Sequence, residues 1–279
     1  MSGIKGLKDG FAEFGDVKLY YEIAGEGSPL VLVHAGICDH RMWDDQFPLL
    51  AQKFRTIRYD MRGYGNSLMS GGQFSHRQDL FQLLKFLGIQ QAHFVGCSMG
   101  GMTVIDFALE HPEMVKSLVL VSSALSGYPY QGKPPQTIFE YITARKEGNL
   151  KRAAELQVQI WVDGTQRSAN MVDRKIRERV YEMGLTALSN QADWMKESGF
   201  VMEEPLQPQA FGRLASLSFP TLSIVGDLDD PSVTDISEAL VKHIVGCRSV
   251  VIKNTAHLPN MEKPEEFNQI VLDFLHRLP

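Results

Sequence analysis

The sequence has little cysteine and no long apolar run. Only Cys38, Cys97 and Cys247 occur in a chain of 279 residues. Such an odd, sparse set does not indicate a disulfide framework, and a reducing compartment fits it best. No segment approaches the roughly 18 apolar residues of a membrane span, and residues 1–15 lack the apolar core of a signal peptide. We therefore expect a cytoplasmic protein that does not contact membranes.

An excess of positive charge is also missing. The chain has 28 Lys and Arg against 33 Asp and Glu, a net charge of −5, and its pI is about 5.9. Nucleic-acid partners usually require a basic surface, so we expect none. No set of His, Asp, Glu or Cys has metal-ligand spacing, which predicts neither a metal nor an organic cofactor. A small-molecule substrate is the expected partner, for a monomer or homodimer.

Short apolar runs alternate with helical patterns along most of the chain. Residues 30–34 (LVLVH) are nearly all apolar, as in a strand buried on both faces. This alternation predicts an α/β fold, with a mainly parallel sheet of about eight strands and helices on both faces. The expected strands are 17–24, 30–34, 55–60, 92–97, 118–122, 221–226 and 249–253. The expected helices outside the middle of the chain are 42–52, 78–87, 99–110, 235–245 and 265–278.

The middle of the chain breaks this rhythm. Residues 124–217 contain no clear buried strand and several helical patterns. A helical insertion between two sheet strands is typical of a cap over the strand ends. We therefore predict a core of residues 1–123 and 218–279, with residues 124–217 as a helical cap. The expected cap helices are 137–146, 150–162, 173–183 and 185–196.

The motif most informative about chemistry is GCSMG at residues 96–100. It fits G-x-S-x-G, in which a serine lies on a sharp turn between a strand and a helix. The expected strand 92–97 leads directly into the motif, and the expected helix 99–110 begins directly after Ser98. Glycines at positions 96 and 100 make room for the turn, and Ser98 lies at a helix N-terminus that favours negative charge. The motif predicts Ser98 as a nucleophile.

A serine nucleophile needs a base, and among eight histidines His257 is the best placed. It follows the last expected strand, and the order serine, acid, histidine then runs along the chain. The acid should follow the strand 221–226, where Asp227, Asp229 and Asp230 are available. We favour Asp229, which lies further round the turn; Asp227 is the second choice, and one unused aspartate should cap a helix or turn.

A tetrahedral intermediate needs two N–H donors. One should be Met99, the residue after the nucleophile, and the other should come from the loop after strand 30–34. Gly36 is the preferred second donor, because a glycine lets the backbone approach the substrate closely. His34 in the same loop is expected to brace the loop and not to act as a base.

These segments resemble the α/β-hydrolase superfamily. Besides the elbow, residues 60–67 (DMRGYGNS) look like its structural D-x-R-G-x-G-x-S loop, and residues 256–264 (AHLPNMEKP) are similar to the segment that carries its histidine. The stretch from His34 to Trp43 places the core closest to the 3-oxoadipate enol-lactonase-like and small carboxylesterase branch. The usual His-Gly pair is here His34-Ala35-Gly36, which leaves the second oxyanion donor open.

The resemblance implies a serine hydrolase that cleaves a carboxylic ester or lactone of a small molecule. A serine at the elbow disfavours dehalogenases and epoxide hydrolases of this fold, which use an aspartate. A carbon–carbon bond hydrolase on the same residues is the main alternative; hydroxynitrile lyases and cofactor-free oxygenases stay open, as does a non-catalytic sensor. The candidate pocket residues, for most of which packing between cap helices is the competing role, are Trp161, Met171, Trp194, Met195 and Phe200.

Overall fold

One mainly parallel sheet forms the core of the molecule. The computed structural model describes residues 6–70, 72–198 and 203–278, and for residues 195–198 only the backbone. The strand order is β1-β2-β4-β3-β5-β6-β7-β8. Strands β1, β2 and β4 pair antiparallel and the remaining pairs are parallel, which confirms the predicted fold class. The strands are β1 (Lys8–Phe14), β2 (Val17–Ala24), β3 (Pro29–Val33), β4 (Arg55–Tyr59), β5 (Ala92–Cys97), β6 (Val115–Val121), β7 (Thr221–Gly226) and β8 (Arg248–Ile252).

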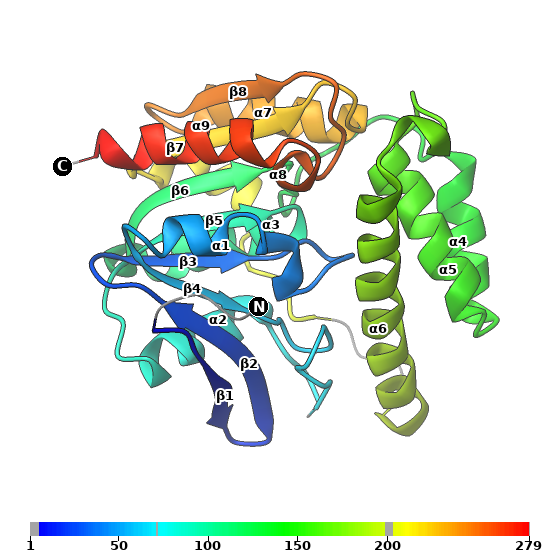
Figure 1. Cartoon of the computed structure of the whole chain (residues 1–279), viewed down its shortest axis with the longest axis horizontal. Coiled ribbons are helices and arrows are strands. Elements are labelled where there is room, and N and C mark those ends of the chain that lie inside the picture. The colour runs from blue at the N-terminus through cyan, green and yellow to red at the C-terminus, as the bar shows by residue number, and fades with distance from the viewer. Residues whose placement is uncertain (1–5, 71, 199–202, 279) are drawn as a thin grey trace.

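Helices cover both faces of this sheet (Figure 1). α2, α3 and α7 pack on one face, and α1, α8 and α9 pack on the other. The α-helices are α1 (Phe47–Leu50), α2 (His76–Phe86), α3 (Met99–Glu110), α4 (Gln136–Lys146), α5 (Leu150–Gln157), α6 (Arg174–Ser198), α7 (Pro231–His243), α8 (Pro259–Glu262) and α9 (Pro264–His276). Short 3-10 helices are η1 (His40–Trp43), η2 (Pro112–Met114), η4 (Ala169–Met171) and η5 (Ala210–Ser216), and η3 (Val158–Asp163) is a π-helical turn.

The apolar run of β3 explains how the sheet is held between these layers. Val31 and Val33 enter the core on one face, while Leu30 and Leu32 enter the core on the other. All four side chains are fully buried. Since successive side chains of a strand point to opposite faces, a strand covered by helices on both sides must be apolar at every position.

Helices α4, α5 and α6 lie side by side, beyond the ends to which the parallel strands point (Figure 1). The chain leaves the sheet after β6 and returns to it in β7, its direct neighbour. These helices share a small apolar cluster of their own, formed by Ala144, Ala153, Ala154, Leu156 and Leu188. The division of the chain at residues 124 and 217 stays a prediction.

The structure differs from the expected elements in several places. The predicted helix 42–52 is the 3-10 helix η1 followed by the four-residue helix α1, and the predicted helix 150–162 ends at Gln157, after which the π-helical turn η3 begins. Strand β1 was not predicted, because only Ala12 of its residues is buried and it pairs on one side alone. The predicted helices 173–183 and 185–196 are one helix, α6, with Gly184 inside it. Helix α7 begins at Pro231, four residues before the predicted start, because Asp230 caps it and a proline suits the first turn.

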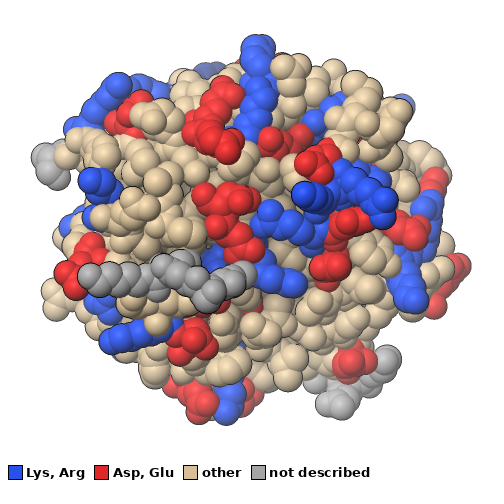
Figure 2. Space-filling view, viewed as in Figure 1, with Lys and Arg blue, Asp and Glu red and all other residues tan. Residues whose placement is uncertain are grey.

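Charged side chains of both signs are mixed on the face shown in Figure 2. Ion pairs within α4, α5 and α6 include Arg174 with Glu178 and Arg152 with Glu140. Within the described residues, no helix is both long and apolar enough to cross a bilayer.

Candidate active site

Ser98 occupies a strained turn between β5 and α3. Its backbone has φ 53° and ψ −116°, which few residues other than glycine adopt. The flanking glycines make the turn possible. A Cβ on Gly96 would lie 2.5 Å from the Gly100 carbonyl oxygen, and one on Gly100 would lie 2.4 Å from the carbonyl oxygen of Val33. The turn thus holds Ser98 at the carboxyl end of the sheet.

A chain of hydrogen bonds links the three residues that the sequence favoured. The Ser98 hydroxyl donates to His257 Nε2 at 2.8 Å. His257 Nδ1–H donates to Asp229, 2.9 Å from Oδ1 and 3.1 Å from Oδ2. The imidazole and the carboxylate are both buried, with 4% and 1% of their side chains exposed. This tautomer leaves Nε2 free to accept the serine proton.

The other two aspartates of the β7 loop have different partners. Asp227 accepts the N–H of Asn254 at 2.6 Å and faces the ammonium of Lys253 at 3.6 Å. Asp230 accepts the N–H of Ser232 at 2.9 Å and caps α7, as expected of one unused aspartate. Only Asp229, among these three, contacts the imidazole.

Glycine at the end of β7 brings the acid and the histidine together. A Cβ on Gly226 would lie 2.3 Å from the carbonyl oxygens of both Thr255 and Ala256. The Leu228 N–H also donates to the Thr255 carbonyl at 2.9 Å. The loop after β7 therefore packs directly on the loop that precedes His257, which no side chain at position 226 would allow.

Gly36 and Met99, the predicted oxyanion donors, lie against each other. A Cβ on Gly36 would lie 3.2 Å from Met99 Sδ. Among the described hydrogen bonds, none uses the N–H of Gly36 or of Ile37. The N–H of Met99 lies in the first turn of α3, where backbone donors lack helical partners. The oxyanion role of Gly36 and Met99 stays a prediction, and the N–H of Ile37 is as free among the described hydrogen bonds as that of Gly36.

His34 braces this loop, as the sequence predicted. Its Nε2 accepts the N–H of Met61 at 2.9 Å, and its Nδ1–H donates to the Ala35 carbonyl at 2.9 Å. The side chain is fully buried, and burial lowers the pKa of His34 below its ordinary value. A neutral ring with both nitrogens engaged has no proton-transfer role.

Cys97, next to the serine, is a poor competitor for the nucleophile's role. Its side chain is fully buried and lies 3.9 Å from the His257 carbonyl oxygen. Burial raises the pKa of the Cys97 thiol well above its ordinary value. The thiolate, which is the reactive form, is therefore strongly disfavoured.

A pocket of about 190 Å³ opens at Ser98 between the core and the cap helices. It is lined by Gly36, Ile37, Ser98, Tyr141, Gln157, Trp161 and His257. The Trp161 ring lies over the imidazole of His257, with 4.6 Å between ring centres. Three larger hollows, of about 1110, 650 and 260 Å³, are lined by none of the three hydrogen-bonded residues, so the small pocket is the relevant one.

Of the predicted pocket residues whose side chains the structure describes, Trp161 alone lines this pocket. Trp194 does not line it and packs edge-on against Phe74, at 6.3 Å between ring centres, so its role in substrate binding stays a prediction. Met171 is 65% exposed and does not line the pocket either. The Met195 side chain and Phe200 lie outside the described residues.

The sequence analysis missed Ile37, Tyr141 and Gln157. Ile37 lies one residue beyond the predicted oxyanion glycine, so the loop itself was the available signal. Tyr141 and Gln157 come from α4 and α5, whose packing against the core brings them to the pocket. No local pattern distinguishes a helix side chain that faces a pocket from one that faces a neighbouring helix.

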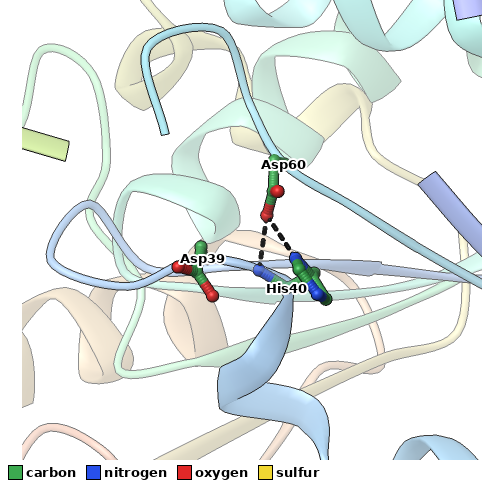
Figure 3. Close-up of side chains that lie close together, drawn as sticks. All are labelled: Asp39, His40 and Asp60. Atoms are coloured by element: carbon green, nitrogen blue, oxygen red, sulfur yellow. Dashed lines mark hydrogen bonds and ion pairs between the residues drawn. The ribbon is translucent and has the colours of Figure 1, made fainter. Parts of the chain in front are cut away.

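Asp39, His40 and Asp60 form a buried cluster that the sequence analysis did not foresee (Figure 3). The fold brings together one ligand atom from each residue within 4.8 Å. Each side chain already has a protein partner. Asp39 pairs with Arg41 through two oxygens, and Asp60 Oδ1 accepts both the N–H and the Nδ1–H of His40. The cluster fits a charge network behind the oxyanion loop better than a metal site.

Known proteins resemble this chain over almost its whole length. The sequence model for the alpha/beta hydrolase fold family matches residues 28–264. The pimeloyl-(acyl-carrier protein) methyl ester esterase of Aeromonas hydrophila is 27% identical, over 90% of this chain and 96% of that protein. The 3-oxoadipate enol-lactonase 1 of Acinetobacter baylyi is 26% identical, over 90% of both chains.

A carbon–carbon bond hydrolase and an esterase of known structure resemble this chain at the same level of sequence identity as the two relatives above. The 2-hydroxy-6-oxo-6-(2'-aminophenyl)hexa-2,4-dienoic acid hydrolase of Metapseudomonas resinovorans is 26% identical, over 96% of this chain and 90% of that protein. The structure of a thermophilic esterase from Thermogutta terrifontis superimposes with a TM-score of 0.79 at 27% identity, covering 97% of this chain and 99% of the other.

Proposed function

The chain belongs to the α/β hydrolase family, and from this premise we propose that it cleaves a carboxylic ester or lactone of a small molecule through an acyl-enzyme on Ser98. The observation that carries the proposal is the hydrogen-bonded chain from Ser98 through His257 to Asp229, whose serine end opens into the pocket. Similarity to named esterases and to an enol-lactonase supports the choice of ester bonds.

In the acylation step, Ser98 Oγ attacks the ester carbonyl carbon while His257 Nε2 takes the hydroxyl proton. The carbonyl oxygen becomes an oxyanion and accepts the N–H groups of Met99 and of Gly36 or Ile37. Each such donor typically lowers the barrier by about 3 kcal/mol. The intermediate collapses to the acyl-enzyme, and His257 gives its proton to the departing alcohol.

Deacylation repeats these steps with water as the nucleophile. His257 takes a proton from water, hydroxide attacks the acyl carbon, and the proton passes to Ser98 Oγ as the acid departs. Asp229 holds the imidazole ring and stabilises its charged form in both halves. The Trp161 ring over the imidazole limits water access and is attracted to the imidazolium that forms in each half. Each step uses only side chains, backbone and water.

Covalent labelling tests the nucleophile. A fluorophosphonate should add once to the protein, and digestion followed by mass spectrometry should locate the label on Ser98. The Ser98→Ala variant should take no label, fold normally and lose at least about 10⁴-fold in turnover of p-nitrophenyl acetate. A Cys97→Ala control should still be labelled. A label on another residue, or unchanged turnover in Ser98→Ala, would contradict the assignment.

Carbon–carbon bond hydrolysis is the second candidate, because a relative of that class is as similar as the enol-lactonase. The same serine and histidine would serve it, with a carbanion as the leaving group in place of an alkoxide. Cleavage of a 2-hydroxy-6-oxo-dienoate can be monitored by the loss of its absorbance. This alternative would be favoured if the protein cleaves that compound and leaves simple esters intact.

A further inference from the structure

The carboxamide of Gln157 has an unusual place in the pocket. Gln157 ends α5 and lines the pocket together with Ser98 and His257, although it is only 6% exposed. Within the described residues its Oε1 has no hydrogen-bond partner. A buried acceptor without a partner is costly, so its retention beside a reacting serine calls for an explanation.

Two neighbours hold this carboxamide in position. Its Nε2 donates to Tyr141 Oη at 3.2 Å. On the other side, a Cβ on Gly184 would lie 2.7 Å from Gln157 Oε1. Glycine inside a helix of 25 residues lowers helix stability, yet here it leaves the room that the carboxamide occupies. The glycine that falsely suggested a helix end therefore makes room for a side chain that lines the pocket.

Tyr141 presents the complementary group. Its hydroxyl oxygen accepts from Gln157 Nε2 and, at 3.4 Å, from Arg145 Nη1. A phenolic hydroxyl accepts hydrogen bonds at its oxygen and donates one through its proton. In the described contacts Tyr141 only accepts, so its hydroxyl proton is available to the pocket. A donor from Tyr141 and an acceptor from Gln157 thus lie side by side.

We propose that Gln157 and Tyr141 recognise a hydroxyl group on the acyl part of the substrate, which makes Gln157 a specificity-determining residue. The inference rests on the proposed ester hydrolysis at Ser98. A hydroxyl accepts from Tyr141 and donates to Gln157 at once, and it can also pair with the carboxamide in its flipped orientation. A carboxylate has no proton to donate to the unpaired Oε1 of Gln157 and would be repelled by it. A methyl group would leave that oxygen without a hydrogen bond.

The surroundings of the carboxamide point to the acyl side of the ester. The position that a Cβ on Gly184 would take, next to Gln157 Oε1, is also 3.5 Å from the Ile37 carbonyl oxygen, beside the proposed oxyanion donors. Trp161, in contrast, lies over His257, which passes the proton to the leaving alcohol. The pocket of about 190 Å³ equals roughly six water molecules in volume, which suits a short acyl chain.

Matched methyl esters test the inference. Methyl 3-hydroxybutanoate and methyl 3-methylbutanoate differ only by a hydroxyl in place of a methyl group, and pairs substituted at C2 or C4 extend the series. We expect the native protein to prefer one hydroxy ester over its methyl partner by about ten- to hundredfold in kcat/KM. Monomethyl succinate, which ends in a carboxylate, should be a poorer substrate than the preferred hydroxy ester.

Two variants connect the preference to the carboxamide. Gln157→Met keeps the length of the side chain and should abolish the preference while raising kcat/KM for the methyl partner. Gly184→Ala should favour the helix but displace the carboxamide, so the preference should fall without loss of folding. Gln159→Met is the matched control, because Gln159 is exposed and does not line this pocket. It should behave like the native protein.

The outcomes separate this inference from the proposed function. Equal rates on every matched pair, a preference that survives Gln157→Met, or a preference for monomethyl succinate would overturn the hydroxyl assignment while Ser98-dependent ester hydrolysis remains. If no ester is cleaved and Ser98 takes no fluorophosphonate, the proposed function fails and the inference fails with it.

Discussion

The two walls of the pocket are held by different forces. On the core side, the loops that carry Ser98 and His257 are fixed by backbone hydrogen bonds and by glycines that allow main chains to touch. On the cap side, Tyr141, Gln157 and Trp161 lie on helical segments that pack on the core through apolar side chains such as Val162 and Met183, with ion pairs from Arg167 and Arg179 beside them. Main-chain contacts leave little freedom, whereas side-chain contacts change with each substitution. We expect substitutions in the core wall to affect the catalytic steps, and substitutions in the cap wall to change substrate selectivity.

The largest predicted effect concerns the core wall. Asp229→Asn should leave the fold intact and lower kcat by up to about 10⁴-fold, because the imidazole loses its counter-charge and the correct tautomer. Asp227→Asn and Asp230→Asn are the controls, since their carboxylates bind backbone N–H groups elsewhere. Their kcat should stay near the native value. An inactive but folded Asp227→Asn would mean that the wrong aspartate has been chosen.

Among the described ion pairs between residues 124–217 and the core, the one that joins Arg167 to Glu262 is the most buried. Both side chains are buried, at 5% and 7% exposure, and their closest atoms are 2.5 Å apart. Glu262 also accepts the N–H of Ala256, the residue before His257. Arg167→Met should destabilise the protein by about 3–5 kcal/mol, because it leaves a buried carboxylate without its cation. Urea unfolding measures this loss, and kcat should fall as the histidine loop relaxes.

A double substitution checks that the loss belongs to the pair. Adding Glu262→Gln to Arg167→Met removes the stranded charge and should restore part of the stability. If Arg167→Met costs less than about 1 kcal/mol, a typical value for exposed pairs, the cap would be held by other contacts and the contrast between the walls would weaken.

Stability in acid should depend on the core and not on the cap. All eight histidines lie outside residues 124–217. Burial lowers the pKa of His93 to about 4, so the unfolded chain takes up that proton first as the pH falls. The contribution of His93 to stability should therefore be lost between pH 6.5 and 4 and should not change further below pH 4. His93→Gln should reduce this loss by about 2 kcal/mol, discounted from the size of the shift.

Unfolding free energies measured at pH 7 and pH 4.5 test this effect. The substitution of exposed His276 by glutamine serves as the control and should leave the difference between the two pH values unchanged. A His93→Gln variant with the native pH dependence would show that other groups cause the acid sensitivity.

The smallest effect should come from the exposed edge of the cap. Arg179 lies 3.6 Å from Asp44 and 3.3 Å from Asp45, with about a third of its side chain exposed. Because solvent screens such pairs, Arg179→Met should cost about 0.5 kcal/mol and leave kcat unchanged. If Arg179→Met lowers the free energy of unfolding in urea as much as Arg167→Met does, solvent exposure does not decide how much each ion pair contributes to stability.

Local sequence patterns predicted most of the core wall but, of the cap wall, only Trp161. The elbow around Ser98 is visible because its glycines and its flanking strand and helix are adjacent in the chain. The choice of Asp229 followed from its distance beyond the strand end, and the structure places its carboxylate against His257. Gln157 and Tyr141 could not be found, because their place depends on how helices pack. Gly184 was misinterpreted for the same reason, since its neighbour is 27 positions away in the sequence.

The direct pairing of β6 with β7 has an evolutionary consequence. Leu118 is aligned with Thr221, so the chain makes its long helical excursion and returns to the adjacent strand. The sheet register is therefore independent of how many residues the excursion contains, and the entropy of closing a loop rises only slowly with its length. Recombination could exchange this segment between homologues at residues beside β6 and β7 without moving the elbow. New substrate ranges would then arise when a different helical segment is inserted into an unchanged core.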